Sequence, residues 1–173
     1  DYFTLSAELS FQRFDLKDWS YLYIRLNNGE YMSTGNCNNL SLGFTLARNS
    51  TDNPIFPRRG SDFSASVHFT PPYSLFSNKD YATYGKDNYD EAASVFNWIE
   101  YHKWKFKAKT YTALSGAQKC PVIMTRAEFG LLGHYNKYKK SPFETFYMGG
   151  DGMTGYSTGY ASETIAWRGY ENG

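Results

Sequence analysis

The stretch that decides the fold class is FTLSAELSFQ, residues 3–12, in which apolar residues alternate with polar ones. Side chains of a β-strand point alternately to opposite faces of a sheet, so this stretch predicts a strand with one apolar face and one polar face. Similar alternation returns in four later stretches. The sequence therefore predicts an all-β protein built from about five antiparallel strands.

The connections between the predicted strands are of two kinds. We expect strands over residues 2–14, 39–50, 61–70, 98–112 and 121–133. Short turns lie over 50–60 and 113–119, whereas the connections over 15–38, 71–97 and 134–173 are long. Short turns on one side and long loops on the other are typical of a bacterial transmembrane β-barrel. A soluble antiparallel sheet with one solvated face gives the same alternation and is the alternative.

The turn over 50–60 is rich in residues that reverse the chain. Asp and Asn side chains bond to nearby backbone, Pro fixes φ, and Gly permits positive φ. The residues of these types that we expect to form the turn are Asp52, Asn53, Pro54, Pro57 and Gly60.

One predicted strand carries lysines on a single face, at positions 103, 105, 107 and 109. Four charged side chains in a row do not fit a soluble core, but they fit a face that lines water while the opposite face contacts lipid. The residues predicted to face a water-filled lumen are Lys103, Lys105, Lys107, Lys109, Arg126 and Glu128. The residues predicted to face lipid are Phe3, Leu5, Leu9, Leu42, Phe44, Phe63, Val67, Phe106 and Phe129.

Composition narrows the class of protein further. The net charge of +1 gives no bulk field that would attract nucleic acid. Aromatic residues make up 19% of the chain, which suits the aromatic girdles of a membrane barrel or a sugar-binding surface. No apolar run reaches the ~18 residues of a membrane-spanning helix.

Cys37 and Cys120 fall at opposite ends of the predicted sheet of strands. They are therefore too far apart for a disulfide, and we expect both thiols to be unpaired.

The first long connection has a helical spacing of apolar residues. Trp19, Leu22, Tyr23 and Leu26 recur at intervals of three and four, which predicts a short helix. The alternative is an extension of a strand, because Leu22, Ile24 and Leu26 also alternate.

The sequence contains no arrangement of residues that indicates catalysis. Residues 150–155 match the G-x-G-x-x-G pattern, but no predicted strand and helix flank them as a dinucleotide site requires. The three histidines are scattered, and no G-x-S-x-G sequence occurs. We therefore expect that the protein is not an enzyme and holds neither a cofactor nor a metal ion.

Three segments carry a resemblance to a known family: the Asp52–Gly60 turn, the segment Phe143–Gly150, and Arg168-Gly169-Tyr170. On these segments the chain resembles the BamA family of bacterial outer-membrane barrel assembly proteins. The stretch 151–164, rich in Gly and Tyr, is similar to that of family members from the Bacteroidota group.

The resemblance implies a sixteen-stranded transmembrane barrel preceded by periplasmic POTRA domains. This chain would then hold about the seventh to eleventh strands and much of the sixth extracellular loop, without any POTRA domain. Trp167-Arg168-Gly169-Tyr170 resembles the Val-Arg-Gly-Phe/Tyr motif of that loop, with Trp167 in place of an aliphatic residue. In the family this loop folds into the lumen, where its arginine contacts acidic groups on the inner wall.

The implied function is the folding and insertion of β-barrel proteins into the bacterial outer membrane. The implied partners are the remainder of the same barrel, nascent barrel clients, accessory subunits and the lipid bilayer. One alternative is a related transporter, a TamA-like factor or a two-partner secretion pore. A different class of alternative is a soluble β-sandwich that binds carbohydrate through its aromatic residues.

Overall fold

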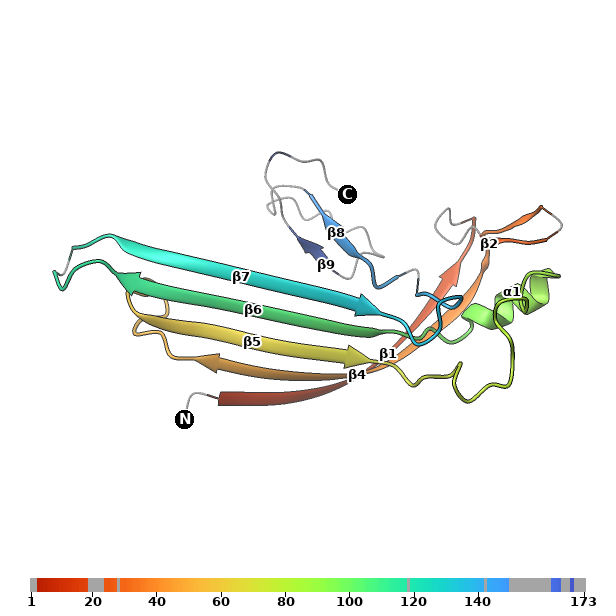
Figure 1. The fold of residues 1–173 in the computed structure, drawn as a ribbon, viewed down its shortest axis with the longest axis horizontal. Coiled ribbons are helices and arrows are strands. Elements are labelled where there is room, and N and C mark those ends of the chain that lie inside the picture. The colour runs from red at the N-terminus through yellow and green to blue at the C-terminus, as the bar shows by residue number, and fades with distance from the viewer. Residues whose placement is uncertain are drawn as a thin grey trace. The chain divides into compact units, whose positions relative to one another are not determined.

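The protein is described by a computed structural model that covers residues 3–18, 24–27, 29–117, 119–141, 143–149, 163–165 and 169. Its main feature is a five-stranded antiparallel sheet with the strand order β1-β4-β5-β6-β7 (Figure 1). The strands of this sheet are β1 (Phe3–Leu16), β4 (Gly35–Asn49), β5 (Gly60–Phe69), β6 (His102–Ala113) and β7 (Val122–Gly133). The prediction of an all-β protein with one antiparallel sheet is confirmed.

The described part of the first long connection is a small hairpin. Strand β2 (Ile24–Arg25) pairs antiparallel with β3 (Tyr31–Met32). The Leu26 N–H donates to the Glu30 carbonyl oxygen at 2.9 Å, and Gly29 has a φ of 89°, which allows the chain to reverse. The helix predicted from Trp19 to Leu26 is therefore wrong at residues 24–26, where strand pairing and the tight turn prevail. Residues 19–23 lie outside the described residues.

The second long connection contains a helix that the sequence pattern did not predict, α1 (Tyr89–Phe96). Its first turn is capped by the Asn88 side chain, which accepts a hydrogen bond from the Glu91 N–H at 2.8 Å. Asp90 and Glu91 stand at the positive end of the helix dipole. Among the described residues, no helix has the length and apolar character needed to cross a membrane.

The chain divides into two compact units. The turn-side unit comprises residues 1–9, 42–68 and 103–131, and the loop-side unit comprises residues 10–41, 69–102 and 132–173. The loop-side unit holds two clusters of buried apolar side chains, a small one of Leu26 and Ala92 and a larger one. The members of the larger cluster are Cys37, Ile99, Tyr101 and Phe143, with Phe14, Leu16 and Leu132 packed against them.

The turn-side unit differs because most of its large apolar side chains are exposed. Phe3, Leu5 and Phe129 are between 62% and 73% exposed. Cys120 of this unit is partly exposed, and both its thiol and that of the buried Cys37 are free.

The turn between β4 and β5 depends on one glycine. The Ser50 N–H donates to the Ser61 carbonyl oxygen at 2.8 Å, which closes the turn at its base. Gly60 has a φ of 108°, and a Cβ atom there would lie 2.2 Å from the Ser50 carbonyl oxygen. Only glycine fits this position without strain.

We predict that Gly60→Ala lowers the free energy of unfolding by roughly 1–3 kcal/mol, because alanine is strained at this positive φ. Gly116→Ala in the other short turn is the matched control, since a Cβ atom at Gly116 would meet nothing within 4 Å. Urea titration of the folded barrel in lipid vesicles measures both changes. Equal stability of the two variants would contradict the role given to Gly60.

Candidate functional site: a two-faced wall and a loop anchor

Charged side chains from three strands meet on one face of the turn-side unit. They line a hollow of about 240 Å³ formed by Asp62, Ser64, Lys107, Lys109, Arg126 and Glu128. Arg126 and Glu128 form an ion pair, with 2.6 Å between Arg126 Nη2 and Glu128 Oε1. Four of the six residues predicted to face a lumen therefore line one polar hollow.

The two remaining lysines of this face are less exposed. Lys103 is buried, with 3% of its surface exposed, and Lys105 is partly buried. The same polar face continues onto β4 and β5. A Cβ atom at Gly43 would lie 2.8 Å from the His68 ring, so the glycine makes room for the imidazole. Thr45 Oγ1 donates to Ser66 Oγ at 3.1 Å.

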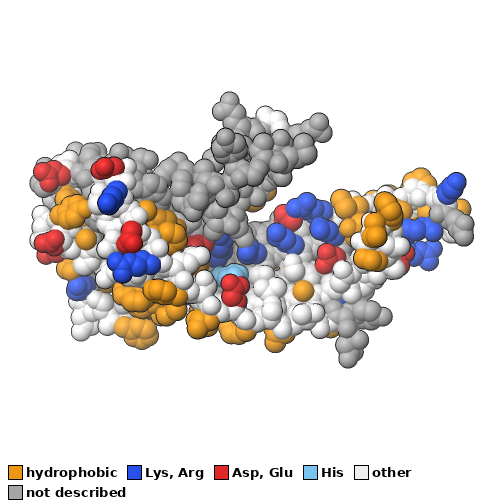
Figure 2. All heavy atoms as spheres, turned by 180° about the vertical axis from the view of Figure 1, so that it is seen from behind, with side chains coloured by type: hydrophobic (Ala, Val, Ile, Leu, Met, Phe, Trp, Pro, Cys, Tyr) orange, Lys and Arg blue, Asp and Glu red, His pale blue; other side chains and the backbone are white. Residues whose placement is uncertain are grey.

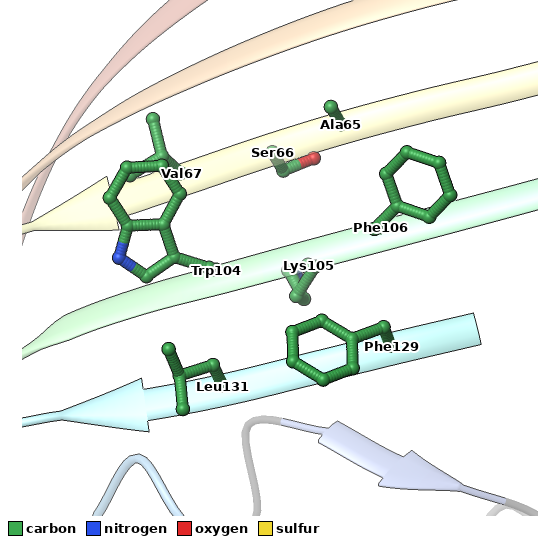
Figure 3. A pocket seen from close by; sticks show the side chains of 8 residues that line it. All are labelled: Ala65, Ser66, Val67, Trp104, Lys105, Phe106, Phe129 and Leu131. Carbon is green, nitrogen blue, oxygen red and sulfur yellow. The ribbon is translucent and has the colours of Figure 1, made fainter.

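The opposite face of the same strands is apolar. It contains a hollow of about 340 Å³ with an apolar lining of Ala65, Val67, Trp104, Phe106, Phe129 and Leu131. Ser66 and Lys105 also border this hollow, although their positions alternate with those of the apolar lining. Figure 3 shows the rings of Trp104 and Phe106 on β6 and the ring of Phe129 on β7 around this hollow. Phe106 also packs edge to face against Phe63, with 4.9 Å between the ring centroids.

The residues predicted to face lipid are mostly exposed side chains. The exposed ones are Phe3, Leu5, Leu9, Leu42, Phe44, Phe106 and Phe129. Phe63 and Val67 are partly buried. Figure 2 shows that apolar side chains gather in patches on the face of the molecule that it displays. An extended exposed apolar face, such as the one formed by these residues, marks contact with a partner or with lipid.

The chain that follows β7 is anchored in the loop-side unit by Phe143. Its ring stacks on that of Phe14, with 4.3 Å between centroids and 6° between planes. Phe14 lies on the polar face of β1, because an even number of positions separates it from Ser10 and Gln12, and such residues of a strand share a face. The segment after β7 therefore returns onto the polar face of the sheet.

Glu144 strengthens this anchor. Its side chain is buried, and Glu144 Oε1 accepts a hydrogen bond from Asn39 Nδ2 at 3.4 Å. The same amide group lies 3.4 Å from Gln12 Oε1 on β1. Phe143 and Glu144 thus contact side chains of both β1 and β4, and we call the four residues Phe14, Asn39, Phe143 and Glu144 the loop anchor.

A buried ion pair fixes a second point of the loop-side unit. Lys139 Nζ lies 3.9 Å from Glu100 Oε2, and the side chains are 6% and 0% exposed. Glu100 Oε2 also accepts the Ser74 N–H at 2.8 Å. The Tyr73 and Tyr81 rings lie 5.7 and 5.6 Å from the ammonium group. Burial lowers the pKa of Lys139, and the neighbouring Glu100 carboxylate partly opposes that effect.

The turn between β4 and β5 is held by its own side chains, as its composition predicts. The Asp52 carboxylate accepts the N–H groups of Arg58 and Arg59 at 2.8 and 3.1 Å. Asn53 Oδ1 accepts the N–H groups of Ile55 and Phe56 at 2.9 and 3.3 Å. Pro54 and Pro57 flank this tip.

The two short turns are tied together by Arg58. Its guanidinium donates to the Ala117 carbonyl oxygen and to Cys120 Sγ, the latter at 3.2 Å. Backbone donors hold the pKa of the exposed Asp52 carboxyl below its ordinary value, with the Arg58 and Arg59 N–H groups as the main cause.

The end of the last loop is described only in part. Trp167, Arg168 and Tyr170 lie outside the described residues. Gly169 has a φ of 96°, a conformation that glycine adopts without strain. Nearby, β8 (Phe146–Met148) pairs in parallel with β9 (Glu163–Ile165). The Gly149 N–H donates to the Ile165 carbonyl oxygen at 3.0 Å.

Phe143 and Glu144 lie in a segment that carries the family resemblance, but the sequence pattern does not predict their contacts with β1 and β4. A local signal existed, because Phe14 and Leu16 are apolar at the positions where β1 otherwise places polar side chains. That break predicts a cover over the polar face. The Glu100–Lys139 pair carried no such signal, because its members lie 39 positions apart in unrelated connections.

Comparison with known proteins identifies the family. The sequence model of the Omp85 superfamily domain matches residues 1–172, and the chain therefore belongs to the Omp85 superfamily. No curated protein sequence matches the chain. The family match and the antiparallel sheet together support a partial β-barrel, in agreement with the predicted fold class.

We predict that Phe143→Ala lowers the free energy of unfolding by about 3–5 kcal/mol, because it removes a buried ring and leaves a cavity against Phe14. Phe56→Ala is the matched control, since Phe56 is 78% exposed. Urea titration in vesicles gives both values, and limited proteolysis reports cleavage after β7. A cost for Phe143→Ala no larger than that for Phe56→Ala would refute the anchor.

We also predict a pH dependence that originates at Asp52. Because its folded-state pKa is lowered, the ionised carboxylate stabilises the fold above its unfolded pKa. That stabilisation is lost as the pH falls below about 4, through the folded-state pKa. Asp52→Asn keeps an acceptor oxygen but does not titrate. The stability difference between the wild type and this variant should therefore shrink on acidification, and parallel pH profiles would disprove the assignment.

Proposed function

We propose that this chain is part of a BamA-type factor that folds β-barrel proteins and inserts them into the bacterial outer membrane. Membership of the Omp85 superfamily gives the coarser statement, a family of outer-membrane barrels that insert or transport proteins. The observation that carries the narrower proposal is the loop anchor. It returns the segment after β7 to the polar face, as an inward-folded sixth loop requires.

The proposed orientation follows from the two faces of the wall. The hollow lined by Lys107, Lys109, Arg126 and Glu128 faces water in the lumen, because charged groups are costly in hydrocarbon. The aromatic hollow around Phe106 faces lipid. The alternation of the two sets along each strand supports this assignment.

The proposed mechanism needs no covalent chemistry, and we propose that the chain has no catalytic role. Backbone N–H and C=O groups at a strand edge are costly in lipid when unpaired. A client strand satisfies those groups by pairing with an open edge of the barrel. In the described sheet the two edge strands are β1 and β7, so the remainder of the barrel must pair with both.

Within this mechanism the last loop acts as a brace. Phe143 and Glu144 fix its start on the polar face. Arg168, near its other end, is proposed to bond to acidic groups of the inner wall. A loop held at both ends keeps the wall in shape while the barrel opens elsewhere to admit a client.

A related transporter of the same superfamily, a TamA-like factor or a two-partner secretion pore, is the second candidate, since the family match fits it equally. The number of POTRA domains in the complete protein and the presence of a plug helix discriminate between them. The soluble carbohydrate-binding sandwich loses its support, because the family match is to an outer-membrane barrel domain. The Bacteroidota assignment rests on the Gly- and Tyr-rich stretch over 151–164.

We predict that Arg168→Ala in the complete barrel slows client insertion roughly tenfold, the effect of losing one charge-assisted hydrogen bond of about 1.5 kcal/mol. Arg13→Ala is the matched control, since Arg13 pairs with Asp15 in an exposed ion pair. Insertion into vesicles is followed by the heat-modifiable migration of a model client. An unchanged insertion rate with Arg168→Ala would remove the brace from the mechanism.

A further inference from the structure

The turn that follows β5 presents two adjacent apolar side chains to solvent. Leu75 is 69% exposed and Phe76 is 81% exposed. The turn itself is tightly wound, because the Tyr73 N–H donates to the Pro71 carbonyl oxygen at 2.9 Å and the Leu75 N–H to that of Pro72 at 3.0 Å. Two neighbouring apolar side chains held out in this way form a candidate surface for contact with another phase or molecule.

The turn is held firmly to the rest of the loop-side unit. The fully buried Thr70 donates its N–H to the Tyr101 carbonyl oxygen at 3.0 Å. The Ser74 N–H donates to the buried Glu100 carboxylate at 2.8 Å. Leu75 and Phe76 therefore project from a fixed base, which lowers the entropy cost of placing them in a partner phase.

The register of the chain shows on which face of the wall the turn lies. Trp98 forms a parallel bridge with Asn38 of β4, and directly paired residues direct their side chains to the same face. An even number of positions separates Asn38 from Leu40 and Leu42, so the three residues share the apolar face of β4. The Tyr73 ring packs against Trp98 with 5.3 Å between centroids. Tyr73 and the turn that carries it thus lie on the apolar side.

We propose that the segment Pro71–Phe76, together with Trp98, is a membrane-interface anchor, with Leu75 and Phe76 inserted at the boundary between lipid headgroups and acyl chains. Tyr and Trp are the residues enriched at this depth, because each combines an apolar ring with a polar group. The anchor follows β5 directly in the chain, because β5 ends at Phe69, six positions before Leu75. The inference rests on the assignment of the apolar face to lipid made under Proposed function.

The test uses nitroxide labels on single cysteines in the complete barrel, with Cys37 and Cys120 replaced by serine. The barrel is reconstituted in vesicles of phosphatidylcholine and phosphatidylglycerol. Labels are placed at Phe76 in the turn, at Phe129 on the wall, and at Thr83, an exposed polar position of the same connection. Collision with oxygen, which concentrates in lipid, and with a water-soluble nickel chelate gives the depth of each label. Heat-modifiable migration confirms that each variant is folded.

We expect the ratio of oxygen to nickel collisions at position 76 to lie above that at 83 and below that at 129. A ratio at 76 equal to that at 83 would place the turn in water and overturn the anchor while leaving the wall in lipid. Loss of access to both reagents at 76 would mean that protein covers the turn, which also overturns it. A collision ratio at 129 as low as that at 83 would instead refute the assignment of the apolar face to lipid.

Discussion

The pairing of backbone hydrogen-bond groups is the constraint on which the rest of this structure depends. An outer-membrane wall contains no water to satisfy unpaired N–H and C=O groups, so its strands must bond to one another across their whole length. Once the strands are paired, the alternation of side chains leaves only two faces. The charged hollow around Arg126 and the aromatic hollow around Phe106 therefore lie on the two faces of one sheet, and the proposed orientation assigns water to the first and lipid to the second.

The polar faces of the two units carry different side chains. In the turn-side unit the polar face carries Lys107, Lys109 and Arg126, which fit an aqueous lumen. In the loop-side unit the corresponding face of β1 and β4 presents Phe14 and Cys37, which the segment after β7 covers. Burial of Phe143 at this point links packing to the proposed function, because in the proposed mechanism the same stabilising contacts direct the last loop inward.

The prediction of one antiparallel sheet is confirmed, because the alternation of a two-faced strand recurs at every second residue, as in residues 3–12. The sequence predicted the turn over 50–60 because Asp52, Asn53 and Gly60 act through local hydrogen bonds and φ. It failed where distant contacts decide the structure. The helix expected near Leu26 is a hairpin at its described residues, helix α1 was not predicted, and the pairing of Glu100 with Lys139 left no local pattern.

The central claim, that the sheet separates water from lipid, is tested most directly by a cysteine scan along β6 from position 104 to 109 in the complete barrel. Each cysteine is labelled with a water-soluble maleimide, and in parallel with a fluorophore that brominated lipid quenches. The account predicts rapid aqueous labelling at 105, 107 and 109 and lipid quenching at 104, 106 and 108. Labelling that does not alternate between neighbouring positions would contradict it.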